Sequence, residues 1–381
     1  MNLLIDAEEI ANAKTGVPRV TFLDTMVLIS LFRQVNLHIS SQVEKVLQNS
    51  YELRIINQFA QQSETKVNVL PNRAQNLGNW ILQGFGGLPL KFITDTDYSY
   101  SSLFPRMYKT ATQQKAIIRL HDPFKKSKDS SQNFLLNRKF KNVIARELRN
   151  HAFEKLLNSN SIFIANSFQT RSRFSEIYDT PIDRFKVIWP SVGFRNQVVL
   201  KDYKLDTHDN YVICVMSQRQ RKNPIFVINS WAKVAAKLKY NLYVVGSIPI
   251  EALTAQALHF LNVGRIRILK SVETSELLTL QKNAMASVFA SEGEGFGMPL
   301  AESMFFGVPV IHNDLDIFTE VCLDAGMTFS LKSSDSLISI FEQLGQDEVG
   351  YQYKRQQSWE QGEKFSHEYA KTKWERVLDL K

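Results

Sequence analysis

The segment Ser291–Glu302 combines residue types that suit the binding of a phosphorylated sugar. Its glycines, at 293, 295 and 297, let the backbone approach a ligand closely, and a helix beginning behind them would offer N–H groups to an anion. Two carboxylates, Glu294 and Glu302, are unsuited to a phosphate because like charges repel. They suit sugar hydroxyls, which donate hydrogen bonds. Phosphate and hydroxyls together predict a sugar nucleotide as the ligand.

Apolar runs on either side of this loop predict its structural setting. Ala284–Ala290 and Val308–Ile311 have the length and composition of buried parallel strands. Pro299 suits the first position of a helix, and Gly307 suits the residue just past a helix end. A tight turn without a ligand would show the same glycines, so the paired carboxylates are what favours binding. The late position of the loop argues against a dinucleotide fingerprint, and the chain has no P-loop motif.

The stretch Glu294–Glu302 resembles the Glu-x7-Glu signature of the retaining glycosyltransferases of family 4, among the group 1 glycosyltransferases. Further segments resemble motifs of the same family, and their order extends the resemblance over nearly the whole chain. These segments are Thr15–Arg19, Leu120–Asp122, Ile164–Gln169, Arg221–Asn223, Ser303–Ile311 and Phe365–Ala370. The resemblance implies an α/β GT-B fold, in which two Rossmann-like, doubly wound parallel-sheet domains face a central crevice.

The length and strand pattern also indicate two domains. A chain of 381 residues with 44% hydrophobic and 22% charged residues has enough apolar content for two cores. Strand-like and helix-like stretches alternate, as in parallel sheets. The expected strands are Asn2–Ile5, Leu53–Ile56, Ala116–Leu120, Ile162–Ala165, Lys186–Ile188, Tyr211–Met216, Leu242–Val245, Ile266–Ile268, Ala284–Ala290 and Val308–Ile311. The expected helices include Val20–Leu37 and Leu135–Leu157.

We expect an N-terminal acceptor domain over residues 1–195 and a sugar-nucleotide-binding domain over residues 196–359. A polar stretch from about Val192 to Asn210 is the expected linker. The resemblance implies that the C-terminal helix, about 360–381, packs back on the first domain.

Cations follow the first expected strand of the second domain, at Arg219, Arg221 and Lys222. The carboxyl ends of parallel strands face the ligand crevice, where a guanidinium and an ammonium would stabilise a departing pyrophosphate. A solvated basic turn is the alternative. The resemblance favours binding by Arg221 and Lys222, whereas Arg219 matches no family position. Met216 stands where the family usually has a glycine, which is a departure in this loop.

Two residues of the first half are candidates on the opposite side of the crevice. His121 ends the strand Ala116–Leu120 and would hydrogen-bond a donor-sugar hydroxyl or the departing oxygen; an ordinary strand-end turn is the alternative. Gly16 would allow close approach of the donor phosphate or the acceptor. Pro18 stands where the family often has a second glycine, and it offers no N–H. Ser167 is expected to cap the helix that follows it.

Charge and cysteine content set the remaining expectations. The net charge is +8, with a balance of +10 over residues 1–200 and −2 over residues 201–381, and the excess peaks over residues 106–149. Such a field favours an anionic partner, and a peripheral anionic membrane surface stays open because no nucleic-acid-binding module is recognisable. Apolar residues recur at four-residue intervals over Asn137–Leu157, and this stripe suits a core-facing helix better than a membrane-surface helix. Cys214 and Cys322 are expected to be buried free thiols.

The N-terminus has no features of a signal peptide, and no run is long enough to span a membrane. A cytoplasmic location fits, with a peripheral position on the inner face of the plasma membrane as the alternative. No group of residues has the spacing of a zinc site, and neither a metal nor a cofactor is expected.

The resemblance implies a metal-independent, retaining hexosyltransferase. The expected donor-binding residues are Gly16, Arg221, Lys222, Glu294, Gly295, Phe296, Gly297 and Glu302, and the expected catalytic groups are His121, Arg221, Lys222 and Glu294. The donor would be GDP-mannose or a UDP-sugar, and the acceptor a lipid-linked oligosaccharide or glycan in surface polysaccharide synthesis. A sugar-nucleotide epimerase on the same fold and a noncatalytic, membrane-associated assembly subunit are the alternatives.

Overall fold

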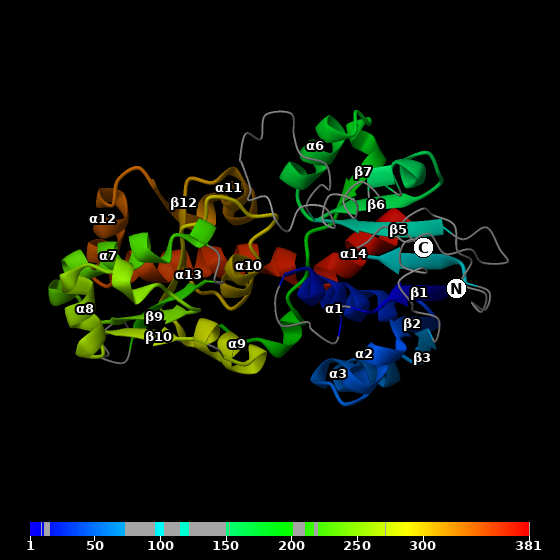
Figure 1. The fold of residues 1–381 in the computed structure, drawn as a ribbon, viewed down its shortest axis with the longest axis horizontal. Coiled ribbons are helices and arrows are strands. Elements are labelled where there is room, and N and C mark those ends of the chain that lie inside the picture. The colour runs from blue at the N-terminus through cyan, green and yellow to red at the C-terminus, as the bar shows by residue number, and fades with distance from the viewer. Residues whose placement is uncertain are drawn as a thin grey trace. The chain divides into compact units, whose positions relative to one another are not determined.

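The computed structural model of the chain describes residues 1–8, 10, 16–72, 96–102, 115–121, 150–151, 153–200, 210–216, 220–270 and 272–380. The chain divides into two compact units (Figure 1). Unit 1 comprises Met1–Ser191 with Ala370–Lys381, and unit 2 comprises Val192–Tyr369. The sequence placed the divisions near residues 195 and 359. They lie elsewhere because the segment after Ser191 pairs with the segment before Ala370 inside unit 2: the Val192 N–H donates to Phe365 O at 2.7 Å, and the His367 N–H to Gly193 O at 2.8 Å.

Unit 1 is built on a parallel sheet in the order β3-β2-β1-β4-β5-β6-β7. Its described strands are β1 Asn2–Asp6, β2 Gln34–Ser40, β3 Lys66–Asn72, β4 Tyr98–Ser101, β5 Lys115–Leu120, β6 Ile162–Ala165 and β7 Phe185–Val187. Its described helices are α1 Gly16–Ile29, α2 Ser41–Gln48, α3 Tyr51–Gln62 and α6 Phe168–Ile177, and most of α14 His367–Leu378 also belongs to it. Each strand pairs in parallel with its neighbours, as the alternating pattern predicts.

Two predicted elements of unit 1 are wrong. Leu53–Ile56 was expected to be a strand but lies in α3, where Leu53, Ile56 and Ala60 form a buried stripe and the Ser50 hydroxyl caps the helix by accepting the Leu53 N–H at 3.1 Å. The expected helix Val20–Leu37 ends at Ile29, and its last residues enter β2. In β2 the buried apolar side chains recur at every second residue, which suits a strand.

A buried network of charged and polar side chains spans the sheet of unit 1. Tyr100 Oη donates to Asp24 Oδ2 at 2.7 Å, and Arg119 Nε forms an ion pair with the same oxygen at 3.2 Å. Burial raises the pKa of Asp24, while the Arg119 charge and the Tyr100 hydrogen bond oppose that change. Arg119 also donates through Nη1 to Ile188 O at 2.8 Å. The network therefore ties α1 to β4, β5 and the chain that follows β7.

Unit 2 has a second parallel sheet, in the order β10-β9-β8-β11-β12-β13. Its strands are β8 Tyr211–Val215, β9 Asn241–Val245, β10 Ile266–Leu269, β11 Ala286–Phe289, β12 Val310–Asn313 and β13 Gly326–Phe329. Its helices are α7 Pro224–Val234, α8 Ala255–Asn262, α9 Thr274–Asn283, α10 Met298–Phe305, α11 Asp316–Cys322, α12 Asp335–Gln343 and α13 Glu348–Gly362. All five strands expected in the second half are present, and among the described strands of unit 2 only β13 was not anticipated.

Burial on both faces explains why the central strand β8 of unit 2 is apolar throughout. On β8, Val212 and Cys214 join the core around Trp231, whereas Tyr211, Ile213 and Val215 pack into a separate cluster on the other face. Parallel sheets are covered on both sides, so alternation is lost from such strands. Cys214 and Cys322 are buried free thiols, as predicted. In the described part of the chain, no helix has the length and apolarity needed to cross a bilayer.

Candidate functional site

The glycine loop joins β11 to α10 at the carboxyl edge of the unit 2 sheet. Gly297 immediately precedes α10 with φ +91°, and a Cβ there would lie 3.0 Å from the Phe318 ring, so both backbone and packing favour glycine. Pro299 is the second helical residue, one position later than predicted. The Phe296 ring is buried and packs edge-on against Phe365, with centroids 6.0 Å apart. This packing fixes the loop in front of the first turn of α10.

The structure brings three of the predicted residues into direct contact. Glu294 Oε2 lies 3.6 Å from Arg221 Nη2, and Glu294 Oε1 lies 3.5 Å from Lys222 Nζ. Arg221 also donates to Gly293 O, and the Ser291 hydroxyl donates to Glu294 Oε1 at 3.0 Å. The two cations expected to hold a diphosphate are therefore paired with the carboxylate expected to hold the sugar. An entering diphosphate would compete with Glu294 for both cations.

Backbone pairing holds the β8 and β11 loops together. The Glu292 N–H donates to Arg221 O at 2.7 Å, and Asn223 Nδ2 donates to Ala290 O at 3.0 Å and to Glu292 Oε1 at 3.3 Å. Asn223 has φ +45° and ψ +47°, a left-handed conformation that asparagine tolerates better than most residues. It directs the chain from the basic turn Gln220–Lys222 into α7. The sequence marked Asn223 only through its family motif, and it gave Ser291 no role.

Glu302 lies on α10, and its side chain is buried with 6% exposure. Gly295 lies in the loop between Glu294 and Phe296. Arg219 and Asp122, which the sequence also singled out, lie outside the described residues, as does nearly all of the basic region 106–149 apart from 115–121. The helical assignment of 137–157 can be followed only over residues 150–151 and 153–157, which are helical.

The two candidates in unit 1 have different surroundings. Gly16 is the first residue of α1 with φ +65°, and a Cβ there would meet no atom within 4 Å, so backbone conformation alone requires glycine. His121 follows β5, and its Nε2 is 2.8 Å from the Ser102 hydroxyl. Burial, followed by the charge of Arg119, lowers the pKa of His121 to about 3. His121 is therefore neutral at physiological pH, and it can exchange hydrogen bonds but carries no charge.

Ser102 is a neighbour of His121 that the sequence did not indicate, because β4 was not predicted. Thr170 also contacts His121, because its Oγ1 donates to His121 O at 3.3 Å. Thr170 lies in the first turn of α6, which Ser167 caps by accepting the Thr170 N–H at 2.9 Å. The predicted capping role of Ser167 is confirmed.

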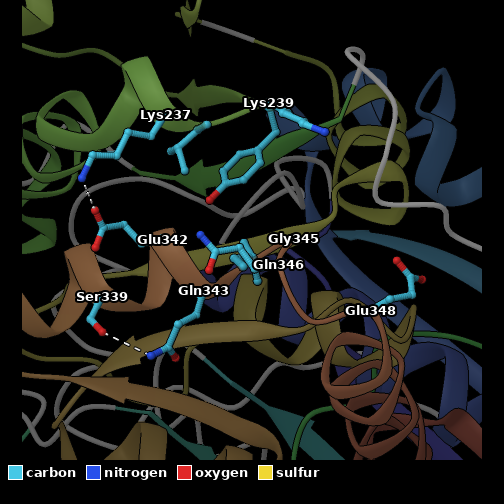
Figure 2. Close-up of a pocket in the computed structure, with 11 residues that line it drawn as sticks. Lys237, Lys239, Ser339, Glu342, Gln343, Gly345, Gln346 and Glu348 are labelled. Carbon is cyan, nitrogen blue, oxygen red and sulfur yellow. Dashed lines mark hydrogen bonds and ion pairs between the residues drawn. The ribbon is translucent and has the colours of Figure 1, made fainter.

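A cavity of about 860 Å³ lies elsewhere in unit 2 (Figure 2). It is lined by residues 237–240 before β9 and by the end of α12 with the loop that follows. Lys237 and Glu342 point toward one another and form an ion pair at 2.9 Å. Since the strands are parallel, this cavity is at their amino ends, opposite the glycine loop. It is therefore separate from the Arg221–Glu294–Lys222 cluster.

The family described as glycosyl transferases group 1 matches residues 197–364. Over these residues, which are less than half of the chain, the protein is similar to the group 1 glycosyltransferases. The match covers both loops of the site, from Arg221 to Glu302. The predicted resemblance is thus confirmed at the level of group 1, and the narrower assignment to family 4 stays a prediction.

Curated proteins that are similar to this chain include two O-antigen proteins. The O-antigen chain mannosyltransferase RfbU of Salmonella typhimurium is 28% identical over 183 residues, which are 47% of this chain and 50% of the relative. O-antigen chain mannosyltransferase B of Escherichia coli is 25% identical over 228 residues, 57% of this chain and 60% of the relative. The chain thus spans about half of the first relative and somewhat more of the second.

A solved structure is similar over the whole chain. The crystal structure of Anabaena HepE in complex with UDP and glucose has a TM-score of 0.63 and 14% sequence identity, covering 100% of this chain and 99% of HepE. At this identity the likeness concerns the fold alone. Together with the two parallel sheets, it confirms the predicted GT-B fold class. The roles predicted for the individual site residues stay predictions.

Proposed function

We propose that this protein is a retaining glycosyltransferase that moves a hexose from a nucleoside-diphosphate sugar to a saccharide or lipid-linked acceptor in surface polysaccharide synthesis. The observation that carries the proposal is the contact of Arg221 and Lys222 with Glu294 at the start of α10. This cluster puts two phosphate-binding cations beside a carboxylate that can accept hydrogen bonds from sugar hydroxyls.

In the reaction, the bond between the sugar C1 and the diphosphate oxygen breaks while a bond forms between C1 and the acceptor oxygen. The acceptor hydroxyl gives its proton to the departing diphosphate, so no carboxylate nucleophile is required. Arg221 and Lys222 stabilise the charge that grows on the diphosphate. The helix start at Gly297 and Met298 supports the same group through its N–H groups and dipole. Glu302 binds the ribose, and Glu294 orients the transferred sugar.

His121 has an uncharged role in this scheme. Because its pKa is lowered to about 3, it donates or accepts a hydrogen bond at a sugar hydroxyl without adding charge to the site. Gly16 gives the donor or the acceptor close access to the backbone at the start of α1. Catalysis then depends on positioning and charge stabilisation, and no metal is required.

Mannose is the proposed sugar, since RfbU and mannosyltransferase B are both named as mannosyltransferases. GDP-mannose is therefore the first donor to test and UDP-glucose the second, because HepE was solved with UDP and glucose. The basic balance of residues 1–200 supports a place at an anionic membrane surface on the cytoplasmic side, where a lipid-linked acceptor would be found.

The test is to incubate the protein with each donor and with lipid-linked or free oligosaccharide acceptors, in chelator, and to measure both nucleoside diphosphate and glycosylated product. We expect the sugar to be transferred with its anomeric configuration unchanged, and NMR of the product would show that configuration. An altered sugar nucleotide without transfer would favour an epimerase. Absence of turnover together with full pathway function of Lys222→Ala would favour a noncatalytic subunit. A strict need for a divalent ion would contradict the metal-independent mechanism.

A further inference from the structure

Arg195 is a half-buried side chain of unit 2, outside the proposed donor site, that contacts the ends of two helices. Its Nη1 donates to Phe305 O, its Nη2 donates to Trp359 O at 2.5 Å, and its Nε forms an ion pair with Glu363 at 3.2 Å. The guanidinium carbon lies 3.3 Å from the centre of the Trp359 ring. Arg195 thus holds the end of α10 and the end of α13 with one planar group.

The contact with Phe305 O completes the C-terminal hydrogen bonding of α10. Gly307, at φ +70°, ends the helix in a Schellman motif, with Val308 N–H donating to Ser303 O at 2.9 Å and Gly307 N–H donating to Met304 O at 2.9 Å. The carbonyl of Phe305 is the last in the helix, and Arg195 donates to it. A cation at this end also complements the helix dipole.

Close packing makes the position of α10 sensitive to this contact. Gly362, the last residue of α13, lies so near to α10 that a Cβ there would overlap Met304 O and lie 2.8 Å from Phe305 Cα. The two helices therefore touch backbone to backbone at their ends. A small shift of this contact would move α10 as a whole, and with it Glu302 and the loop end at Gly297.

The Arg195 guanidinium is charged under ordinary conditions. Burial lowers its pKa to about 10, and the nearby Glu363 and Glu368 oppose that change. Glu368 also accepts the Arg195 backbone N–H at 3.2 Å. Two acidic residues, Glu363 and Glu368, therefore also hold Arg195 in place.

We propose that Arg195 is a positioning residue for the donor: it sets the place of α10, and thereby of Glu302 and the helix start, without touching the ligand. This inference rests on the proposed function, because it assumes that α10 binds a nucleoside diphosphate. A lysine at this position would keep the charge but lose the fork that reaches two carbonyls and the flat surface that lies on Trp359.

The test compares Arg195→Lys with Arg265→Lys. Arg265 is a matched control in the same unit, because it also clamps backbone carbonyls, donating to Leu238 O at 2.7 Å and Tyr240 O at 2.9 Å, at the amino end of β9. We would measure binding of GDP and of UDP by calorimetry, kcat/KM for transfer, thermal stability, and amide hydrogen exchange of α10. We expect Arg195→Lys to lose on the order of tenfold to a hundredfold in kcat/KM. Exchange of the α10 amides should be faster, and Arg265→Lys should change only thermal stability.

Three results would overturn the proposal: unchanged diphosphate binding and kcat/KM in Arg195→Lys, unchanged α10 exchange in that variant, or equal losses in Arg265→Lys. If Arg195→Lys did not fold, Glu363→Gln would decide, since Glu363 is exposed and removing its charge should leave the fold intact. Faster hydrogen exchange of the α10 amides in Glu363→Gln would support the positioning role of Arg195, and an exchange rate equal to that of the wild-type protein would overturn it. If the wild-type protein bound neither GDP nor UDP, the proposed function would fail, and the exchange rates would still decide whether Arg195 fixes α10.

Discussion

Replacing Glu294 by glutamine should tighten the binding of a bare nucleoside diphosphate while reducing sugar transfer. Glu294 lies 3.5 Å from Lys222 Nζ and 3.6 Å from Arg221 Nη2. It therefore occupies the two cations that a diphosphate needs. Glutamine keeps the shape and the hydrogen-bonding ability of the side chain but removes the competing charge.

The magnitude follows from those distances. At an effective dielectric constant of about 20, each pair attracts by about 4–5 kcal/mol. Solvent reduces this strongly, because 38% of the Arg221 side chain is exposed, against 15% for Lys222 and 12% for Glu294. We expect a net competition of about 1–2 kcal/mol, which corresponds to diphosphate binding tighter by about fivefold to thirtyfold. The gain should shrink as salt is added.

The assay is calorimetric titration of GDP and UDP into wild-type, Glu294→Gln and Glu292→Gln proteins at low and physiological ionic strength. Glu292 is the matched control: it carries the same charge in the same loop, but its carboxylate accepts a hydrogen bond from Asn223 Nδ2. Only Glu294→Gln should bind diphosphate more tightly, and kcat should fall because the sugar loses its carboxylate partner. Unchanged or weaker diphosphate binding by Glu294→Gln, or an equal gain in Glu292→Gln, would refute the competition.

Three further predictions concern stability and its dependence on pH. Gly297→Ala should lower the free energy of unfolding by about 1–2 kcal/mol in urea titrations, because the residue has φ +91° and a Cβ would press on the Phe318 ring; wild-type stability would contradict this. Asp24→Asn should destabilise by about 3–5 kcal/mol by leaving Arg119 buried without its ion pair, and adding Arg119→Met should recover part of that loss; strictly additive losses would show that the pair is not coupled. The folded protein keeps His121 neutral down to about pH 3, whereas the unfolded chain binds a proton below its ordinary value of 6.5, so stability should fall as the pH is lowered through this window, by at most about 1.4 kcal/mol per unit from this residue. His121→Gln should flatten that slope in urea titrations between about pH 6 and 4, and an unchanged slope would be inconsistent with a neutral His121 in the folded protein.

The sequence determined five strands of unit 2, β8 to β12, because each of these segments carries a largely apolar run of strand length by itself, whereas β13 has no such run and was not anticipated. It also determined the special backbone positions, such as Gly307 after α10, because few residues adopt a left-handed conformation. A short apolar segment is compatible with both a strand and a helix, and the sequence was then not sufficient to decide between them. Leu53–Ile56 was expected to be a strand and lies in α3.

Only the tertiary structure decided which side chains meet. The order of the parallel strands places β8 beside β11, and this pairing brings Arg221 and Lys222 to Glu294 although they are far apart in the chain. The contacts of Arg195 with the ends of α10 and α13 likewise join segments that are far apart in the chain. No residue pattern within either segment specifies its partner, since such contacts follow from the packing of whole elements. The chemistry of this site was therefore readable in its residue types, and its arrangement followed only from the order of the strands.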